Sequence, residues 1–194
     1  MGGTEVTALG DQAPTQGGER VPLERSPVER GPVERVGNTC WRWRHGQMTG
    51  PAVVFDLDGV LADASARQHF IKGRPPDWES FFTASSDDPV IEETATLLGL
   101  LSPDLTIVLL TARPARTGPV TVEWLSRYDV RWDLLVMRCT GDHQPAQSFK
   151  RDAVRALRAR GLDLKLCVED DLRNVEMFRA EGLTALYIHS GYYE

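Results

Sequence analysis

The sequence predicts a doubly wound, Rossmann-like α/β fold, in which helices cover both faces of a parallel sheet of about five strands. From residue 51 onward, short apolar runs alternate with helix-like stretches, as in chains that build parallel sheets. Most of these runs are apolar throughout, which is typical of strands buried on both faces. Polar residues follow several runs directly, at the sheet edge where α/β folds bind ligands.

The apolar runs and the stretches between them give the expected order of elements. We expect strands at residues 52–55, 106–110, 134–137, 165–168 and 185–188. We expect helices near residues 89–101, 117–127, 148–160 and 172–181. In the third helix, Ser148 is the expected N-cap and Gly161 the expected end. Residues 62–88 lie between the motif that follows the first strand and the next expected helix.

Residues 1–48 differ in composition from the rest and are expected to form a disordered tail, which leaves one folded domain at residues 49–194. The tail is rich in Gly, Pro, Glu and Arg, and its repeat PLERS-PVERG-PVERV is too short to build a core. A docking arm anchored by Trp41 and Trp43 is the functional alternative. A third interpretation makes Met48 the natural start of the protein.

Composition limits the partners and the compartment. The net charge is −6, and because acids and bases balance in the tail, the domain carries all of it. Tight nonspecific binding to long nucleic acid is therefore not expected. Cys40, Cys139 and Cys167 form no CxxC pair and are expected to be free thiols in a reducing cytosol, so we predict a cytoplasmic protein. The N-terminus lacks a secretory signal pattern, and the most apolar stretch, residues 97–112, is too interrupted to span a membrane.

The strand ends carry the candidate site. Asp56-Leu57-Asp58-Gly59 follows the first strand, Thr111-Ala112-Arg113 the second and Glu169-Asp170-Asp171 the fourth, while Lys150 lies at the start of the preceding helix. Because the carboxyl ends of parallel strands meet at one edge, these groups should converge. Crowded carboxylates repel one another unless a cation intervenes, and Mg²⁺ is the natural cofactor for oxygen ligands beside a phosphate. For Asp171, capping of the next helix is the alternative.

Each of these residues suits a step of phosphoryl transfer. Asp56, a carboxylate beside a metal, can attack phosphorus and form an aspartyl-phosphate. Asp58, two residues later on the same side of the chain, can protonate the leaving oxygen and then activate water. Thr111 offers a hydroxyl and a backbone N–H to phosphate oxygens, and Lys150 supplies positive charge. Gly59 permits the tight bend that follows.

Taken in order, DLDGV, LLTARP, Lys150 and VEDD resemble the motifs of haloacid dehalogenase-like phosphohydrolases, over about residues 51–194. The resemblance implies that Asp56 is the nucleophile and a metal ligand. It also implies that Asp58 is the acid/base and contacts the metal through its backbone carbonyl. The phosphate-binding and metal-binding positions of the family fall on Thr111, Lys150, Glu169 and Asp170.

A closer resemblance is to the phosphatase domain of polynucleotide kinase-phosphatases and their stand-alone bacterial relatives. It rests on DWESFF (77–82), LLVMR (134–138), GDHQP (141–145) and VEDDLRNVEMFRAEGL (168–183). This sequence departs from the family pattern at Phe178, where a tryptophan is common, and at Gln144, where relatives carry an arginine. The phosphate-binding motif of the kinase half, GxxxxGK followed by Ser or Thr, does not occur. A separate kinase or ligase partner is therefore the expectation.

The insertion at residues 62–88 occupies the slot in which this family carries its cap. It is short, so an open site is expected, which suits a bulky substrate such as a nucleic acid end. Its aromatic residues form either a local cluster on the sheet or a base-stacking lid. A local basic rim is expected from Arg67, Lys72, Arg74, Arg113, Arg116 and Arg138. Arg113 and Arg138 are the expected substrate contacts, although Arg113 is equally compatible with a surface position.

These residues favour a Mg²⁺-dependent phosphomonoester hydrolase that acts through an aspartyl-phosphate, with a 3′-phosphorylated nucleic acid end as substrate on the resemblance alone. A phosphatase for nucleotides or other small metabolites is the nearest alternative. A noncatalytic binding module that keeps the fold is the alternative from another class. It is disfavoured because every position that the chemistry needs is filled. No membrane partner is expected.

Overall fold

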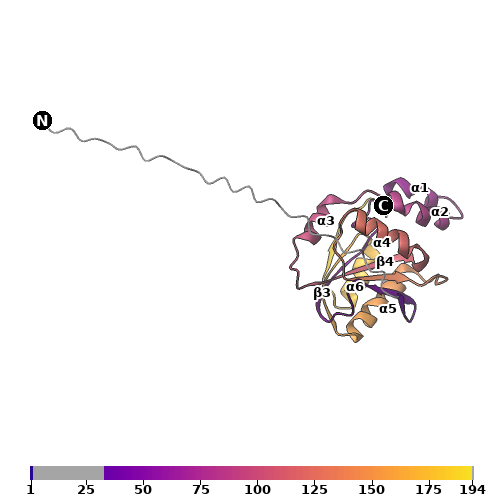
Figure 1. The fold of residues 1–194 in the computed structure, drawn as a ribbon. Coiled ribbons are helices and arrows are strands. Elements are labelled where there is room, and N and C mark those ends of the chain that lie inside the picture. The colour runs from indigo at the N-terminus through magenta and orange to yellow at the C-terminus, as the bar shows by residue number, and fades with distance from the viewer. Residues whose placement is uncertain (2–32, 194) are drawn as a thin grey trace.

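The computed structural model describes Met1 and residues 33–193, and in these residues a seven-stranded sheet lies between two layers of helices (Figure 1). The strands are β1 (Val33–Val36), β2 (Thr39–Trp43), β3 (Gly50–Phe55), β4 (Thr106–Pro114), β5 (Leu134–Arg138), β6 (Leu162–Glu169) and β7 (Ala185–Tyr187). The α-helices are α1 (His69–Lys72), α2 (Trp78–Thr83), α3 (Glu92–Gly99), α4 (Gly118–Arg127), α5 (Ala146–Ala159) and α6 (Leu172–Ala180). The 3-10 turns are η1 (Ser65–Arg67), η2 (Ala84–Asp87) and η3 (Ala115–Thr117).

The sheet has the strand order β1-β2-β5-β4-β3-β6-β7. Strands β5, β4, β3, β6 and β7 run parallel, whereas β1 and β2 form an antiparallel hairpin that joins the sheet through β5. The chain enters the sheet centre at β3, builds β4 and β5 on one side, and then crosses to β6 and β7 on the other. This doubly wound path confirms the predicted fold class, and the five predicted strands are the parallel part.

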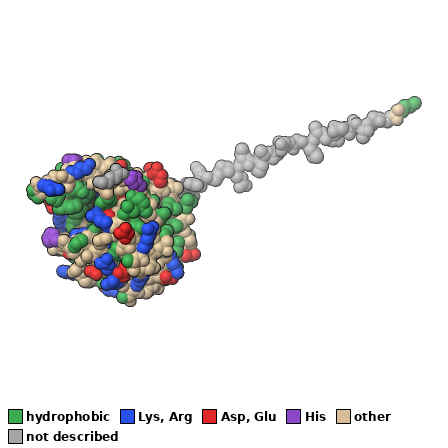
Figure 2. Space-filling view, turned by 180° about the vertical axis from the view of Figure 1, so that it is seen from behind, with side chains coloured by type: hydrophobic (Ala, Val, Ile, Leu, Met, Phe, Trp, Pro, Cys, Tyr) green, Lys and Arg blue, Asp and Glu red, His purple; other side chains and the backbone are tan. Residues whose placement is uncertain are grey.

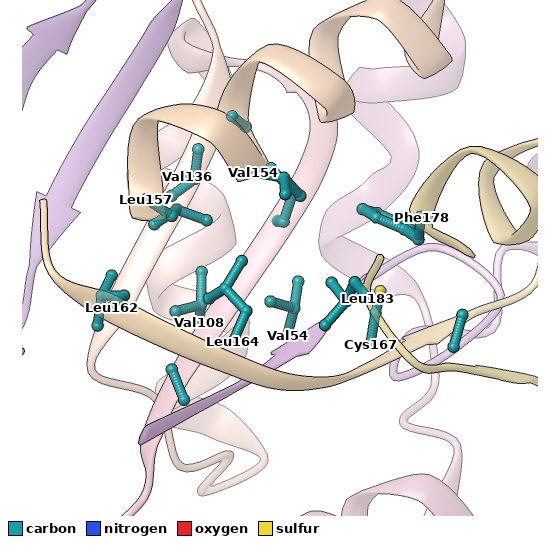
Figure 3. Packing of buried hydrophobic residues seen from close by; sticks show 14 of the residues in the cluster. Val54, Val108, Val136, Val154, Leu157, Leu162, Leu164, Cys167, Phe178 and Leu183 are labelled. Carbon is teal, nitrogen blue, oxygen red and sulfur yellow. The ribbon is translucent and has the colours of Figure 1, made fainter. Parts of the chain in front are cut away.

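Alternate residues of the central strands face opposite helix layers. Val54 and Val108 pack with side chains of α5 and α6, such as Val154 and Phe178 (Figure 3). Their neighbours along β3 and β4 belong to a second buried cluster, which includes side chains of α3 and α4. Because both faces of the sheet are covered, these strands are apolar throughout, as the sequence predicts.

The register of the parallel strands decides what meets at the sheet edge. Phe55, the last residue of β3, pairs with Leu109 of β4 and with Val168 of β6. The residues that follow are therefore level with one another, so Asp56 and Glu169 leave the sheet side by side. Thr111 lies two residues beyond Leu109 on the neighbouring strand.

Residues 33–43 form β1 and β2, so the prediction of a disordered tail was wrong for this segment; residues 2–32 lie outside the described residues. Trp41 is fully buried in the cluster that contains α5, and its Nε1 donates to Thr39 Oγ1 at 2.6 Å. It is thus part of the chain's own core and not an anchor for a partner. In this hairpin, charged residues alternate with apolar ones at the antiparallel edge of the sheet. Composition alone does not distinguish this pattern from that of a solvated, disordered chain.

Cys40 of β2 and Cys139, directly after β5, form a disulfide. The expectation of free thiols was therefore wrong for these two residues, whereas Cys167 is free and buried as expected. The two cysteines are 99 residues apart in sequence. They become neighbours only because β2 pairs with β5, and spacing along the chain gives no sign of that pairing.

The insertion at residues 62–88 contains η1, α1, α2 and η2. Its aromatic side chains Trp78, Phe81 and Phe82 contact one another, and Phe81 is buried while Trp78 remains 50% exposed. These three rings form a local cluster, whereas the predicted packing on the sheet and the alternative base-stacking lid both stay predictions. The C-terminal segment lies beside the start of the insertion (Figure 1). There the Tyr192 hydroxyl donates to Asp63 Oδ1 at 2.8 Å.

The four predicted helices correspond to α3, α4, α5 and α6. Helix α5 begins at Ala146, so Ser148 lies within it and is not its N-cap. Gly161 follows the end of α5 with φ +87°, as expected of a glycine that ends a helix. Of the helices in the described residues, none combines the length and apolar character that crossing a membrane requires.

Candidate active site

Asp56, Lys150 and Glu169 form a buried ion-pair chain at the carboxyl edge of the sheet. Lys150 Nζ lies 2.9 Å from Asp56 Oδ2 and 2.7 Å from Glu169 Oε2. Lys150 comes from α5, which packs on the sheet beside β4 and β6, and 2% of its side chain is exposed. The opposite Glu169 oxygen, Oε1, accepts from the backbone N–H of Asp171 and from Asn174 Nδ2. Both oxygens of Glu169 are therefore occupied.

Asp170 is the carboxylate in this group that lacks hydrogen bonds of good geometry. Both of its side-chain oxygens are buried, and neither has a hydrogen bond of good geometry among the described residues, although the nearby Ser190 side chain acts to lower its pKa. Ligand atoms of Asp56, Glu169 and Asp170 all lie within 4.8 Å of one another. Three carboxylates and one lysine carry a local charge of −2, and a buried polar atom without a partner is costly. These residues therefore fit a divalent cation, and Asp170 has more free ligand capacity than Glu169.

Gly59 permits the close approach of the first motif to Asp170. It adopts φ +84° in the turn after β3, where the backbone N–H groups of residues 60–62 donate to the carbonyl of Leu57. A Cβ added to Gly59 would lie 1.9 Å from Asp170 Oδ2 and 3.1 Å from Ser190 Cβ. Any side chain here would therefore occupy the space of a candidate metal ligand.

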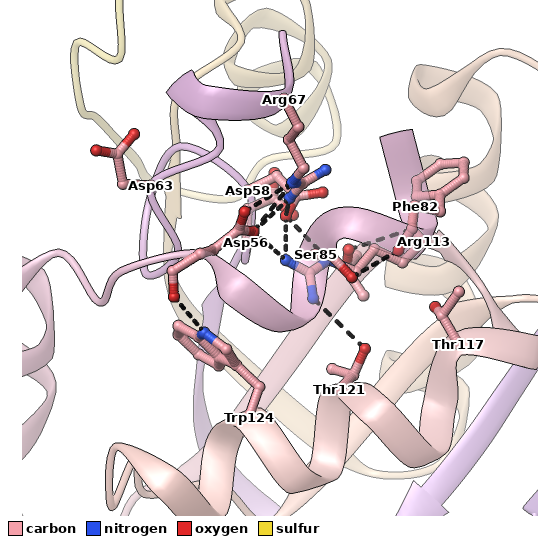
Figure 4. Close-up of polar contacts among 12 residues, drawn as sticks. Asp56, Asp58, Asp63, Arg67, Phe82, Ser85, Arg113, Thr117, Thr121 and Trp124 are labelled. Atoms are coloured by element: carbon pink, nitrogen blue, oxygen red, sulfur yellow. Dashed lines mark hydrogen bonds and ion pairs between the residues drawn. The ribbon is translucent and has the colours of Figure 1, made fainter. Parts of the chain in front are cut away.

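Asp58 belongs to a second polar group, which faces the insertion (Figure 4). Arg67 Nη2 donates to Asp58 Oδ1 at 2.6 Å, and Arg113 donates to the same oxygen from Nε at 2.9 Å and from Nη2 at 2.5 Å. Both guanidinium groups also contact the buried carboxylate of Asp88. Two arginines and two carboxylates therefore balance one another in charge.

The two groups hold their carboxyls in opposite electrostatic states. Burial raises the pKa of Asp56 to about 7, assisted by Glu169 and Asp58 and opposed by Lys150. Burial and the charge of Asp56 raise the pKa of Asp170 to about 8. For Asp58 burial acts in the same direction, but Arg113 and Arg67 outweigh it and lower the pKa to about 2. Asp58 is thus a carboxylate at neutral pH, whereas Asp56 and Asp170 ionise together only with difficulty unless a cation is bound.

The remaining predicted residues lie at neighbouring strand ends. Thr111 is buried at the last residue of β4 that pairs with β5 before a register shift, and its Oγ1 accepts from the backbone N–H of Arg113 at 3.2 Å. Arg138 ends β5, donates to the carbonyl of Gln144 at 2.8 Å and lies over the ring of Phe149. Among the described residues, its contacts are not with either carboxylate group. Asp171 caps α6 by accepting from the backbone N–H of Arg173, which was its alternative interpretation.

The basic rim expected around the site is only partly present. Arg67 and Arg113 are 2% and 1% exposed, so these two do not belong to an exposed rim, and of the two interpretations of Arg113 the surface position was wrong. On the face of the molecule in Figure 2, basic and acidic side chains are interspersed, and no patch of a single sign stands out. Asp88 is a site residue that was not predicted from the sequence. Its position at the end of the insertion resembles an exposed turn, and its role depends on arginines that arrive from 21 and 25 residues away.

The fold and the site together define a phosphatase domain of the haloacid dehalogenase-like class. Residues 50–193 match the family described as the polynucleotide kinase PNKP phosphatase domain, and the chain belongs to this family. No curated protein matches the chain in sequence.

Solved structures of this class share the fold. Two chains from structures of a Pnkp1/Rnl/Hen1 complex, one described as an RNA repair complex, superpose with TM-scores of 0.62 and 0.63 at 22% and 19% identity. These alignments cover 72% and 86% of this chain but 42% and 51% of those chains, so this chain spans about half their length. The class C acid phosphatase from Bacillus anthracis has a TM-score of 0.57 at 18% identity, over 76% of this chain and 70% of that one. At these identities the likeness concerns the fold alone.

Proposed function

We propose that the chain is a Mg²⁺-dependent phosphomonoester hydrolase that forms an aspartyl-phosphate on Asp56. The observation that carries this proposal is the buried group at the sheet edge. An oxygen of Asp56 lies 2.9 Å from the Lys150 ammonium, and possible ligand oxygens of Asp56, Asp170 and Glu169 lie within 4.8 Å of one another. Mg²⁺ held by Asp56, Asp170 and the backbone carbonyl of Asp58 would offset the negative charge that the carboxylates and the phosphate bring together.

In the first step an oxygen of Asp56 attacks phosphorus, and the bond from phosphorus to the leaving alcohol breaks. Lys150 contacts Oδ2 of Asp56, which leaves Oδ1 as the attacking oxygen. Asp58 gives a proton to the leaving alcohol. In the second step water attacks the aspartyl-phosphate, Asp58 takes a proton from this water, and inorganic phosphate leaves as Asp56 is regenerated. Thr111 and Lys150 bind the phosphate oxygens in this scheme, and Arg138 is assigned to the substrate. Arg113 is buried against Asp58 and acts through that carboxylate.

The charge state of Asp58 places a condition on the first step. Its arginine partners lower its pKa to about 2, so the substrate-free chain holds it in the form that suits the second step. The proton for the leaving oxygen must therefore arrive with the substrate. A phosphate monoester can bring it as the monoanion, because its second pKa is about 6. This proton would then pass through Asp58 to the leaving oxygen as the bond to phosphorus breaks, because the alkoxide that forms is a far stronger base than either group.

We propose a 3′-phosphorylated nucleic acid end as the substrate, since the family is that of polynucleotide kinase phosphatase domains and the insertion is short. The test compares hydrolysis of a 3′-phosphorylated oligonucleotide with a panel of mononucleotides and sugar phosphates, each with Mg²⁺ and with EDTA. We expect the oligonucleotide to have the highest kcat/KM and EDTA to abolish turnover. Activity confined to the small molecules would replace this substrate with a nucleotide or metabolite.

The nucleophile is tested with Asp56→Asn and a matched surface variant, Asp163→Asn. We expect Asp56→Asn to fold and to lose at least about 1,000-fold in kcat with 4-nitrophenyl phosphate, because an amide cannot form the covalent intermediate. Asp163 is 60% exposed and forms an ion pair with the exposed Lys165, so its variant should keep full activity. If Asp56→Asn retains activity, Asp56 is not the nucleophile. If the protein without any substitution is itself inactive, a noncatalytic binding module is favoured.

The proposed function also implies a partner, and the structure bears on the location that was predicted from the sequence. A separate protein that supplies a kinase or ligase activity is the partner we propose, and the named complex that contains Pnkp1 is the supporting comparison. A cytoplasmic location was proposed from the sequence, but the Cys40–Cys139 disulfide argues against it, because disulfides are uncommon in a reducing cytosol. Trapping the thiols with an alkylating reagent at cell lysis would show which state the cell maintains.

A further inference from the structure

Asp88 is a buried carboxylate to which the proposed chemistry gives no role. It follows η2 at the end of the insertion and is 3% exposed. The backbone carbonyl of Asp88 accepts from Nε1 of Trp124 on α4 at 2.7 Å (Figure 4). This hydrogen bond fixes the backbone at Asp88. A buried charge is costly unless it is paired, so its partners indicate what it does.

Those partners are the two arginines that hold Asp58. Arg67 contacts Asp88 in a bidentate fork, with Nε donating to Oδ1 at 2.8 Å and Nη2 donating to Oδ2 at 2.7 Å. Arg113 Nη2 donates to Asp88 Oδ2 at 3.1 Å. A bidentate fork fixes the plane of a guanidinium group as well as its position. Asp88 therefore sets the orientation in which Arg67 meets Asp58.

The contacts on Asp58 are one-sided. All three guanidinium hydrogen bonds that it accepts from the described residues end on Oδ1, and 20% of its side chain is exposed. Oδ2 is thus the oxygen left for a substrate. Without Asp88, two buried cations would share one carboxylate, and Arg67 would lose both halves of its fork. The guanidinium groups would then turn further onto Asp58 and compete for Oδ2.

We propose that Asp88 is a positioning residue for the acid–base step, because it holds Arg67 and Arg113 on Oδ1 of Asp58 and so keeps Oδ2 aimed at the leaving oxygen. The inference rests on the proposed function of Asp58. It also links the insertion to the chemistry, since Arg67 and Asp88 come from the two ends of that segment.

The test exploits the leaving group. A nitrophenolate leaves without needing a proton, whereas an alkoxide needs one, so a misplaced acid should slow alkyl esters far more than aryl esters. Asp88→Asn is compared with Asp87→Asn, the exposed neighbour, in the full chain. The two substrates are 4-nitrophenyl phosphate and the alkyl phosphate that the unchanged protein hydrolyses best.

For Asp88→Asn we expect kcat on the alkyl phosphate to fall about 100-fold or more and kcat on the aryl phosphate to fall less than about 10-fold, with KM nearly unchanged. Asp87→Asn should match the unchanged protein. In an Asp58→Asn background, Asp88→Asn should cause no further loss on the alkyl phosphate, because the residue acts through Asp58. Equal losses on both substrates, or additive losses in the double variant, would overturn the inference and leave Asp88 with a structural role.

A second variant covers failure of Asp88→Asn to fold. Asp88→Glu keeps the charge balance and displaces the carboxylate by one methylene, so it should melt near the unchanged protein and show a smaller loss of the same selectivity. If Asp88→Glu shows no selectivity between the two substrates, the inference fails. If the protein without substitutions hydrolyses neither substrate, the proposed function itself is refuted. If that protein is active and Asp88→Asn slows both substrates equally, only the role of Asp88 is refuted.

Discussion

At the scale of single residues, the site separates its carboxylates by environment. Asp58 is held ionised by two arginines, whereas Asp56 and Asp170 are buried together with one lysine. Groups whose surroundings push their pKa values apart take different chemical roles. In the proposed function, this separation suits Asp58 to proton transfer and suits the other two to holding a cation.

Gly59→Ala tests how closely that pair is packed, and Gly182→Ala is its matched control. Both glycines have positive φ, but a Cβ at Gly182 meets no atom within 4 Å, whereas one at Gly59 would overlap Asp170. We expect each variant to lose about 1 kcal/mol or more of stability from backbone strain, measured by denaturant unfolding. Only Gly59→Ala should also weaken Mg²⁺ activation, by at least about tenfold. Equal activation in both variants would contradict the placement of Asp170.

Sequence predicted the residues whose meeting follows from strand order alone. Asp56, Glu169 and Asp170 come directly after parallel strands, so the sheet brings them together whatever the loops do. Arg67 and Asp88 meet because the insertion folds back on itself, and no short motif reports that. Arginines in a polar segment are therefore predicted to lie at the surface, although here burial beside a carboxylate makes Arg67 a partner of Asp58.

At the scale of elements, the parallel core was predictable because continuous apolar runs indicate strands buried on both faces. The hairpin β1–β2 was not predictable, because only part of it is buried and its apolar residues alternate with arginine and glutamate. Its largest contribution to the core is Trp41, a residue that also suits an exposed docking arm. A short amphipathic edge next to a Pro-rich stretch has too weak a pattern to distinguish these cases.

The Cys40–Cys139 disulfide is expected to stabilise this part of the fold. It closes a loop across 99 residues, and a link of this kind contributes about 2–5 kcal/mol by restricting the unfolded chain. Dithiothreitol should therefore lower the Tm by roughly 5–15 °C. The double variant Cys40→Ser, Cys139→Ser should have the lower Tm at once and show no response to the reductant. If the unchanged protein melts at the same temperature in both conditions, the link contributes nothing to stability.

At the scale of the whole molecule, stability should depend jointly on pH and on Mg²⁺. The pKa values of Asp56 and Asp170 are raised from 3.8 to about 7 and about 8 in the metal-free fold. The folded state therefore holds protons that the unfolded state releases above about pH 4. Its free energy of unfolding should fall as the pH rises from about 4 to about 8. A bound cation replaces those protons, so its stabilising effect should be largest at the alkaline end.

Thermal melting with Mg²⁺ and with EDTA measures this effect. We expect the Tm gain from Mg²⁺ at pH 8 to exceed that at pH 5 by about 5 °C or more. Asp170→Asn should raise the metal-free Tm at pH 8 and remove most of the gain, while Asp163→Asn should behave like the unchanged protein. NaCl at matched ionic strength controls for screening. A gain that is equal at both pH values would argue against a cation among these carboxylates.

The antiparallel pairing of β2 with β5 also bears on a polypeptide that begins at Met48. Such a molecule would lack both N-terminal strands, and the main-chain amides and carbonyls along one flank of an apolar strand would be left bare. The slot now filled by Trp41 would open beside them. Copies of the shortened molecule would then tend to pair flank to flank, whereas in the longer chain the short, charged strand β1 forms this edge of the described sheet.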